Sequence, residues 1–497
     1  MSAVPPPEKP SAIDRLAAAP GEVWTSVKPL FLPDIKWASA FQPRRSDPDL
    51  RPVPLGFLAL IVVGGLLLMH PAAHAPGRSL AWIDAFFLSV SAVSVTGLTP
   101  VNIAEVLSPF GHAVILALVQ LGGLGIVTAS LALVMLGGER LSLAQESAVA
   151  ATVGRLQRAR PAELFRFSCL IVALVETAGT AALYWRLEAA NPDADPLLLI
   201  WHAFFHAVSA FCNAGFSIFP EGLVRWSGDA GLLGIVNVLV VAGGIGLLSL
   251  MNLRYYRFFR RDPKRRGRLT LQTKLAAVTT LALIALGAVA TLVFEWNRTL
   301  IDSDGLQSVS LAVFHSVMTR TAGFNAVDIA VLHPATLFVS MGLMFIGGSP
   351  GSMAGGIKTV TFAVLLGACR SALRRDDNVQ ILNRRISPRT INTALMVTVL
   401  AGFVVVAGIS ALMLTELGRP ASQTAGHWLG LAFEAVSAFG TVGLSTGLTP
   451  LLTDGGKLVL MALMFTGRVA PLMLAVYLAR PMKRWHIRHP EEEVALG

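Results

Sequence analysis

Charged residues are scarce in this sequence. Only 14% of its 497 residues are Asp, Glu, Lys or Arg, whereas 54% are hydrophobic, and the mean hydropathy is +0.63. A soluble protein of this length needs a far more charged surface. The scarcity of charge therefore excludes a soluble fold and predicts an all-α polytopic membrane protein.

Cysteine is also rare, and several chemical motifs are missing. Cys169, Cys212 and Cys369 lie far apart and fit neither a disulfide framework nor a zinc-ligand spacing. There is no P-loop, dinucleotide fingerprint or catalytic triad, so we expect no bound organic cofactor and no enzymatic activity. A membrane-embedded enzyme would need clustered acidic or histidine residues, and the acidic pair at 376–377 stands alone in a basic loop.

Positive charge is in excess but is concentrated in short loops. The net charge of +10 would suit a nucleic-acid partner, yet the basic residues cluster between apolar stretches, at 139–166, 252–274 and 369–390. This is the positive-inside pattern of membrane proteins. We therefore expect no nucleic-acid partner and place these loops and both termini in the cytoplasm. Residues 1–50 lack the apolar core of a signal peptide and are expected to form a cytoplasmic tail.

Four similar apolar segments recur along the chain. They are FFLSVSAVSVTGL at 86–98, FFHAVSAFCNAGF at 204–216, VFHSVMTRTAGF at 313–324 and FEAVSAFGTVGL at 433–444. Their glycines are Gly97, Gly215, Gly323 and Gly443, which are 118, 108 and 120 residues apart. Aligning the segments on these glycines pairs Ser316 with Val90 and Val317 with Ser91. A recurring unit of this size is a whole membrane module and not a solenoid repeat.

Each module is predicted to contain a span, a short apolar segment, a glycine turn and a second span. The expected helical segments are 53–70, 81–93 and 109–136; 162–185, 197–211 and 232–253; 271–294, 307–318 and 335–372; 390–414, 425–439 and 457–478. The corresponding divisions of the chain are a tail at 1–50, repeats at 51–140, 141–258, 259–376 and 377–484, and a tail at 485–497. The middle segments are too short to cross a bilayer, so we expect re-entrant pore helices. Non-helical backbone at membrane depth must line a cavity or be buried, which predicts four pseudo-symmetric helix–pore helix–filter–helix repeats around a central pore.

The glycine turns are the candidate selectivity filter. Glycine permits backbone angles that turn successive carbonyl groups to one side, and a ring of carbonyls can replace the hydration shell of potassium. The predicted filter residues are Val95, Thr96, Gly97, Leu98, Asn213, Ala214, Gly215, Phe216, Thr321, Ala322, Gly323, Phe324, Thr441, Val442, Gly443 and Leu444. The carbonyls expected to bind potassium are those of Val95, Thr96, Asn213, Ala214, Thr321, Ala322, Thr441 and Val442. The alternative is that the glycines serve only close packing.

The second span of the third repeat contains a candidate gate. Residues 347–356 include five glycines and a proline, which exclude a continuous helix. The predicted gate residues are Gly347, Gly348, Ser349, Pro350, Gly351, Ser352, Gly355, Gly356, Lys358 and Arg468. The alternative is a rigid break that only lets helices pack closely.

Ionisable residues in apolar segments are functional hypotheses by default. Arg468 could raise the barrier to cations and set the resting state of the gate, or it could form a structural ion pair with Glu434 or Glu176. Arg320, beside the filter, is expected to point behind it and pair with an acid. Asp84 is expected to favour the positive N-terminal end of the first pore helix.

Three histidines, His202, His206 and His315, lie in predicted pore helices. Their spacing does not direct them to one point, so we expect polar packing rather than a metal site.

Several motifs together resemble the Trk/Ktr/HKT superfamily of potassium transporters. They are CNAGF at 212–216, RTAGFN at 320–325, the loop at 347–358 and TGR at 466–468. The segments FGTVGL at 439–444, GLTP at 447–450 and RHPEE at 488–492 are most similar to the Ktr-type membrane subunit. The resemblance covers residues 53–492.

This resemblance implies potassium uptake across the cytoplasmic membrane of a prokaryote, often stimulated by sodium. It also implies a homodimer and a cytosolic ring of nucleotide-binding, RCK-type regulatory subunits. Sodium-favouring HKT relatives replace the first filter glycine with serine, so Gly97 favours potassium. The chain departs slightly from the family pattern at Ser94, Met318 and Thr319. A proton-coupled Trk-type carrier, with Glu176 as a relay, and a sodium transporter are the alternatives.

Overall fold

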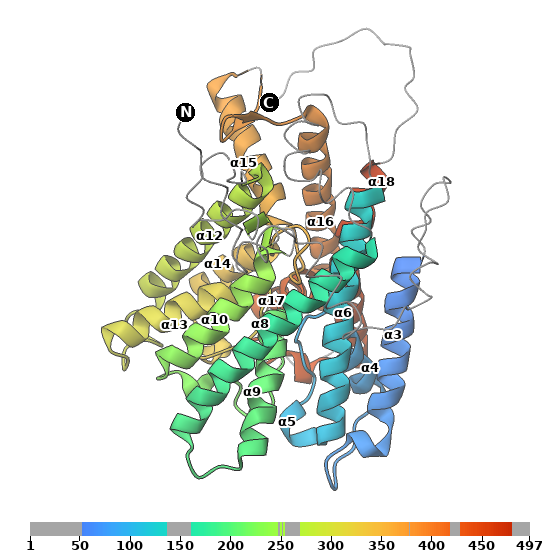
Figure 1. Ribbon diagram of the computed structural model, residues 1–497, viewed down its shortest axis with the longest axis vertical. Helices are drawn as coiled ribbons and strands as arrows, with labels where there is room; N and C mark the ends of the chain where they lie inside the picture. Colours follow the sequence, from blue (N-terminus) through green and yellow to red (C-terminus); the bar gives the residue numbers. More distant parts are fainter. Residues whose placement is uncertain are drawn as a thin grey trace, which may run out of the picture. The chain divides into compact units, whose positions relative to one another are not determined.

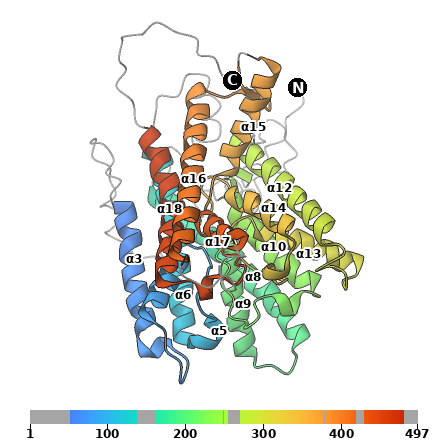
Figure 2. The ribbon, with the colours of Figure 1, turned by 180° about the vertical axis from the view of Figure 1, so that it is seen from behind.

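The computed structural model describes residues 52–136, 161–246, 249–250, 252–253, 269–376, 378–417 and 428–479. The predictions for the two tails and for most of the first two basic loops lie outside these residues. The regular secondary structure of the described part is helical, apart from the short antiparallel pair β1 (Gln380–Ile381) and β2 (Arg384–Arg385). The expected all-α class is thus confirmed (Figures 1 and 2).

The helices follow the predicted order of span, pore helix and span. The first spans are α3 (Pro52–Met69), α8 (Pro161–Ala190), α12 (Leu271–Glu295) and α16 (Pro388–Thr415). The pore helices are α4 (Trp82–Val93), α9 (Pro196–Phe211), α13 (Gly305–Met318) and α17 (Trp428–Gly440). The second spans are α6 (Pro109–Leu136), α10 (Ala230–Ile245), the pair α14 (Pro334–Phe345) and α15 (Thr359–Arg374), and α18 (Asp454–Ala479). The short helix α5 (Ile103–Val106) precedes α6.

The lengths of these helices separate spans from pore helices. The pore helices have 12 to 16 residues, too few for a bilayer at about 1.5 Å per residue. Among the described residues, three stretches are long and apolar enough to cross a membrane: Ser168–Ala190, Leu271–Glu295 and Pro388–Thr415. Each first span packs against the pore helix of its own repeat.

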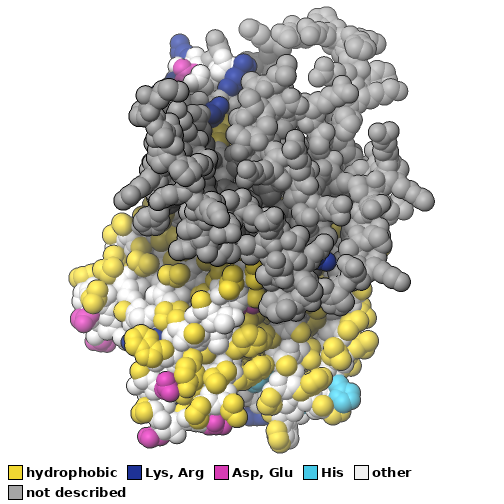
Figure 3. Space-filling view, in the orientation of Figure 1, with side chains coloured by type: hydrophobic (Ala, Val, Ile, Leu, Met, Phe, Trp, Pro, Cys, Tyr) yellow, Lys and Arg dark blue, Asp and Glu magenta, His cyan; other side chains and the backbone are white. Residues whose placement is uncertain are grey.

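The outer surface of the described helices is apolar. Hydrophobic side chains cover much of the coloured lower part of the surface in Figure 3, and charged groups are sparse there. Leu281 and Phe403, on two different first spans, are 66% and 70% exposed. Such exposure suits lipid contact, because acyl chains are as apolar as these side chains.

Acidic side chains begin several helices. Asp195 and Asp304 precede two pore helices, and their carboxylates accept the backbone amides of Leu197 (3.0 Å) and Gln307 (2.7 Å). Asp84 lies in the first turn of α4, as expected. These caps satisfy amides that have no partner inside the helix and complement the positive helix end.

Two buried glutamates join the first and second spans. Glu295, the last residue of α12, accepts hydrogen bonds from the His333 amide (2.8 Å) and the Thr336 hydroxyl (2.5 Å) at the start of α14. Glu416, which ends α16, accepts the amide (3.0 Å) and hydroxyl (2.7 Å) of Thr453 before α18. The third and fourth repeats therefore share a carboxylate link at the same place.

One predicted span is shorter than expected. The segment at 232–253 was expected to be one helix, but α10 ends at Ile245, and Gly246 has a φ of +89°. A Cβ at Gly246 would lie 2.8 Å from the Pro350 carbonyl oxygen in the third repeat. The approach of this other backbone requires glycine and stops the helix.

Glycines in three second spans let the pore helices approach closely. A Cβ on Gly122, Gly243 or Gly467 would collide with a carbonyl oxygen at the end of the pore helix in the same repeat. The oxygens concerned belong to Val93, Phe211 and Phe439 respectively. Each of these glycines therefore sets the distance between a second span and the backbone that leads into the glycine turn.

Gly467→Ala should destabilise the protein, because neither backbone can move aside without shifting a helix. We expect a loss of about 1–3 kcal/mol, typical of overpacking. The thermal unfolding midpoint in detergent measures it. Gly402→Ala in α16 is the control, since nothing lies within 4 Å of its Cβ position. Equal midpoints for the two variants would contradict the prediction.

Candidate ion pathway

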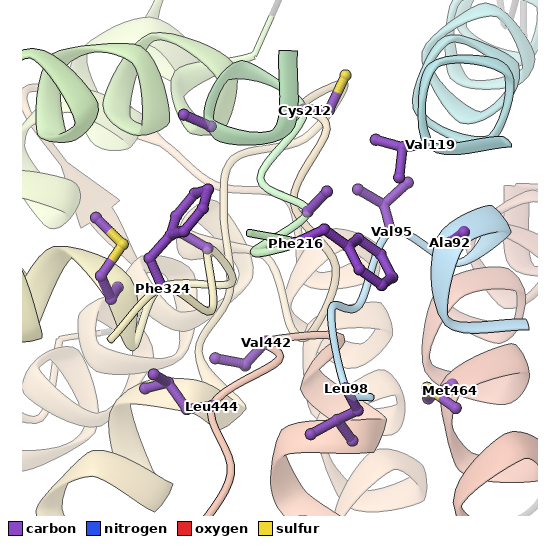
Figure 4. Packing of buried hydrophobic residues seen from close by; sticks show 14 of the residues in the cluster. Ala92, Val95, Leu98, Val119, Cys212, Phe216, Phe324, Val442, Leu444 and Met464 are labelled. Carbon is purple, nitrogen blue, oxygen red and sulfur yellow. The ribbon is translucent and has the colours of Figure 1, made fainter. Parts of the chain in front are cut away.

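The four glycine turns meet around one axis. A Cβ added to any of the four glycines would press on the carbonyl oxygen of a turn in another repeat. The pairs are Gly97 with Ala214, Gly215 with Ala322, Gly323 with Val442, and Gly443 with Thr96. These contacts run from repeat 1 to 2, 3 and 4 and back to 1, so they close a ring. Figure 4 shows the four differently coloured segments converging, with Val95, Phe216, Phe324 and Val442 on separate strands.

Each turn has an unusual backbone at two alternate positions. The glycines have φ values between +69° and +95°. The residue two places before each glycine also has a positive φ, although none of these residues is glycine: Val95 (+56°), Asn213 (+59°), Thr321 (+68°) and Thr441 (+50°). Successive carbonyls of a normal strand point to opposite sides, and reversing φ at alternate residues brings them to the same side. Strained backbone of this kind clusters at functional sites.

The turns direct their side chains into the protein. Leu98, Phe216, Phe324 and Leu444 are at most 2% exposed. Backbone amides of the turns form hydrogen bonds within the protein. For example, the amide of Thr96 donates to the carbonyl of Ser91 in the pore helix at 2.8 Å.

The carbonyl oxygens of the turns are, by contrast, unpaired. Within the described part of the chain, no hydrogen bond reaches the carbonyls of Val95, Thr96, Asn213, Ala214, Thr321, Ala322, Thr441 and Val442. An unpaired carbonyl away from water is costly unless something replaces the missing partner. A ring of such oxygens is suited to a dehydrated cation.

Serine hydroxyls in the pore helices fix the turns. Ser91 and Ser437 accept the amides of Gly97 (3.0 Å) and Gly443 (3.1 Å). Ser209, at the matching position of the second repeat, donates to the Phe216 carbonyl at 2.8 Å. The sequence alignment paired these serines but suggested no role for them.

The third repeat has one residue fewer between the serine of its pore helix and the glycine of its turn, since Ser316 lies seven positions before Gly323 and Ser89 lies eight positions before Gly97. Ser316 donates to the Ile284 carbonyl of its first span at 2.7 Å, as Ser89 does to Ile61 at 2.7 Å. Ser316 therefore corresponds to Ser89, and the predicted pairing of Ser316 with Val90 is wrong by one residue. In the third repeat, the alignment on the glycines is correct for the turn but is shifted by one residue for the pore helix.

The third turn lacks the serine hydroxyl that its neighbours use. Met318, and not Val317, takes the place of Ser91, since its carbonyl accepts the Ala322 amide at 3.1 Å. The Gly323 amide has to share that same carbonyl at 3.3 Å. The third turn is thus held by backbone alone where its neighbours use a serine.

The broken span forms a buried loop that contacts all the other repeats. The amides of Ser349 and Met353 donate to carbonyls of α10 in the second repeat, at 2.9 and 3.3 Å. A Cβ at Gly355 would lie 3.0 Å from the Gly440 carbonyl oxygen in the fourth repeat, and one at Gly123 in the first repeat would lie 3.1 Å from the Met353 sulfur. Helix α14 stops before this loop and α15 resumes after it, which confirms the predicted break.

Three basic side chains donate to carbonyls of this loop. Their partners are Met353 for Arg468 Nη1 (2.5 Å), Ala354 for Lys358 Nζ (2.7 Å) and Gly347 for Arg320 Nη2 (3.0 Å). The acid predicted as the partner of Arg320 is therefore replaced by a backbone oxygen. A carbonyl suffices because it offers a buried acceptor at the point where the loop passes the pore helix.

The two acids suggested for Arg468 bind elsewhere. Glu434 accepts hydrogen bonds from residues that follow the fourth turn. Glu176 accepts Gln120 Nε2 at 3.1 Å, and the Cys212 thiol lies 3.1 Å from Gln120 Oε1. Gln120 was not predicted, since a lone glutamine in an apolar span gives no signal without its neighbours.

The remaining candidates have structural contacts. Asp84 also forms an ion pair with Lys457 at 2.6 Å, which links the first and fourth repeats. His206 Nε2 lies 2.9 Å from the Ser217 hydroxyl, and His315 Nε2 lies 3.0 Å from the Ser340 hydroxyl. His202 packs edge-on against a phenylalanine. These are polar packing contacts of the expected kind.

Comparison with known proteins agrees with this architecture. Residues 35–485 match the family described as TrkH, cation transport protein. The chain belongs to this family. The resemblance stated from the motifs is thereby confirmed, and the family consists of transporters rather than enzymes.

Two curated relatives and one solved structure illustrate the match. Ktr system potassium uptake protein B of Bacillus subtilis is 34% identical over 465 residues, 93% of this chain and 98% of that protein. Potassium/sodium uptake protein NtpJ of Enterococcus hirae is 33% identical over 460 residues, 91% and 99% of the two chains. The crystal structure of the potassium transporter TrkH from Vibrio parahaemolyticus shares the fold, with a TM-score of 0.66 and 19% identity over 89% of this chain and 88% of that one.

Ser437→Ala should loosen the fourth turn, because the buried amide of Gly443 loses its acceptor. An unsatisfied buried donor costs about 1–3 kcal/mol, so the thermal unfolding midpoint in detergent should fall. Ser410→Ala is the matched control, since its hydroxyl is exposed and bonds only within α16. The prediction is refuted when both variants unfold at the same temperature.

Proposed function

We propose that this TrkH-family member takes up potassium across the cytoplasmic membrane of a prokaryote, through the ring of four glycine turns. The observation that supports this most is the closed ring of turns with unpaired carbonyl oxygens. Potassium would be held by the eight carbonyls named above and hydrated again on leaving them. The names of the Bacillus and Enterococcus relatives, which specify potassium uptake, support the same ion.

The pore helices support a cation in two ways. Their C-terminal ends lead directly into the turns, so the negative ends of four helix dipoles lie beside the unpaired oxygens. Their acidic caps and Asp84 lie at the opposite ends. We place those ends on the outer face, which follows from the basic loops being cytoplasmic.

Sodium is the second ion to consider. The Enterococcus relative is named for both potassium and sodium, so sodium could stimulate uptake here or be transported itself. Proton coupling of the Trk type has a weaker basis, namely the buried Glu176 near Cys212.

The loop between α14 and α15 is the proposed gate. It contacts the fourth turn through Gly355, whose Cβ position falls on the Thr441 hydroxyl, and its carbonyls accept hydrogen bonds from Lys358 and Arg468. Two fixed positive charges raise the barrier to cations in a medium of low dielectric constant. Each hydrogen bond holding the loop contributes only about 0.5–1.5 kcal/mol, so the loop can be displaced at modest cost.

A partner would supply the control of this gate. We propose a homodimer that binds a cytosolic RCK-type ring, which would account for the basic loops at 139–166, 252–274 and 369–390. Anionic lipid headgroups would also bind such loops. The word "system" in the names of the Ktr relatives is in line with a transporter of several components.

Gly97→Ser tests the filter. Its Cβ would meet the Ala214 carbonyl oxygen, and φ at this position is +95°, so the ring should distort. In a bacterium without its own potassium uptake, the unmodified chain should restore growth at low potassium, and the variant should restore it less and become sensitive to sodium. Gly77→Ala, at an outer turn with no atom within 4 Å, is the control for substitution of a positive-φ glycine.

If the unmodified chain alone fails to restore growth despite confirmed membrane expression, the regulatory ring is added and growth is measured again. Failure to grow even then would refute potassium uptake. Normal growth of Gly97→Ser would refute the filter at these turns.

Arg468→Gln tests the gate. Removing the charge and the bond to the Met353 carbonyl should increase cation flux into proteoliposomes severalfold in the absence of any partner. Arg298→Gln, in an exposed loop, is the charge-matched control and should leave flux unchanged. Unchanged flux in Arg468→Gln would contradict a role of this side chain in closing the pathway.

A further inference from the structure

Glu434 is a fully buried carboxylate in the fourth pore helix. Its Oε1 accepts the Ser445 hydroxyl (2.7 Å), the Thr446 amide (2.8 Å) and the Thr446 hydroxyl (3.1 Å). Its Oε2 accepts the Thr449 hydroxyl at 2.6 Å. Four donors therefore converge on one side chain, and all of them follow the fourth glycine turn within six residues of Gly443.

These donors form the outer continuation of the filter strand. Ser445 is separated from Gly443 by Leu444 alone, whose side chain is buried. Glu434 belongs to the pore helix that precedes the fourth turn, so its hydrogen bonds connect this helix to the strand that follows the turn. A charge-assisted hydrogen bond is about twice as strong as a neutral one, so four of them hold this strand firmly.

The same position is used differently in the other repeats. Glu434 lies nine positions before Gly443, and the residue nine positions before the glycine is Leu88 in the first repeat and His206 in the second. The third repeat is one residue shorter here, so its corresponding residue is His315, eight positions before Gly323. His206 contacts Ser217, which is placed like Ser445, two residues after its glycine. The second and fourth strands, opposite each other in the ring, are thus tied to their pore helices through equivalent residues.

We infer that Glu434 is a positioning residue of the filter, which fixes the spacing of the carbonyls from Thr441 to Leu444 and with it the preference for potassium over sodium. The inference rests on the proposed function of these turns. Among the described residues, no lysine or arginine forms an ion pair with Glu434. Its charge is instead distributed over hydroxyl and amide donors, which suits a fixed anchor.

Glu434→Gln should lower the ratio of potassium to sodium uptake in proteoliposomes about tenfold, the factor that one hydrogen bond to a charged group supplies. Glutamine keeps the size of the side chain but replaces one acceptor with a donor. The double variant Ser445→Ala/Thr449→Val keeps the carboxylate and removes two donors, so it should lower the ratio to a similar extent. Loss of selectivity in Glu434→Gln alone would point to charge and overturn the positioning role.

Glu416→Gln is the matched control, because it alters another buried carboxylate of the same repeat, which accepts hydrogen bonds from Thr453 at the start of α18 and not from the strand that follows the turn. It should lower the unfolding midpoint and leave the ion ratio unchanged. Gly97→Ser serves as the reference for the filter. A changed ratio in Gly97→Ser but not in the Glu434 and Ser445/Thr449 variants would overturn this inference alone, whereas unchanged ratios in all of them would overturn the proposed function as well.

Discussion

The structure depends on keeping carbonyl oxygens unpaired at membrane depth. Hydrocarbon offers no hydrogen bonds, so each such oxygen is costly unless a cation or the surrounding protein compensates it. The fold meets this constraint by satisfying everything else around the turns. Amides bond back to the pore helices, serine hydroxyls take the glycine amides, and the side chains are buried. Within the described part of the chain, the carbonyl oxygens of the turns remain unpaired, each with a partial negative charge.

The second requirement is that backbone segments approach each other closely. Glycines allow this in the ring of turns, behind the ring and at the loop. At the ring, a glycine of each repeat lies against a carbonyl of the next. Behind the ring, Gly122, Gly243 and Gly467 let second spans press on the ends of the pore helices. Below it, Gly246 makes room for the loop and ends α10. A Cβ at any of these places would widen the assembly, and the oxygens would no longer converge.

The sequence predicted the order of helices, the break between α14 and α15 and the register of the four glycines, because each leaves a local signal in hydropathy or composition. It could not reveal contacts between distant residues. The bond from Arg320 to the Gly347 carbonyl, the pairing of Glu176 with Gln120 and the ion pair of Asp84 with Lys457 all depend on tertiary arrangement. The alignment also placed Ser316 wrongly, since a deletion of one residue inside an apolar helix changes no hydropathy pattern.

The four repeats share the same backbone path but differ in the side chains that hold their turns, and these differences follow a pattern. The third repeat has Met318 in place of the serine that fixes the neighbouring turns, and its turn is followed by the broken span, whose loop accepts a hydrogen bond from Arg320. The fourth has the most tightly fixed turn, through Ser437 and Glu434. Both of these turns also meet the loop, at Gly347 and Gly355. In the proposed gating, a less constrained strand beside a firmly held one would let the loop move on one side of the ring while the oxygens on the other side keep their spacing.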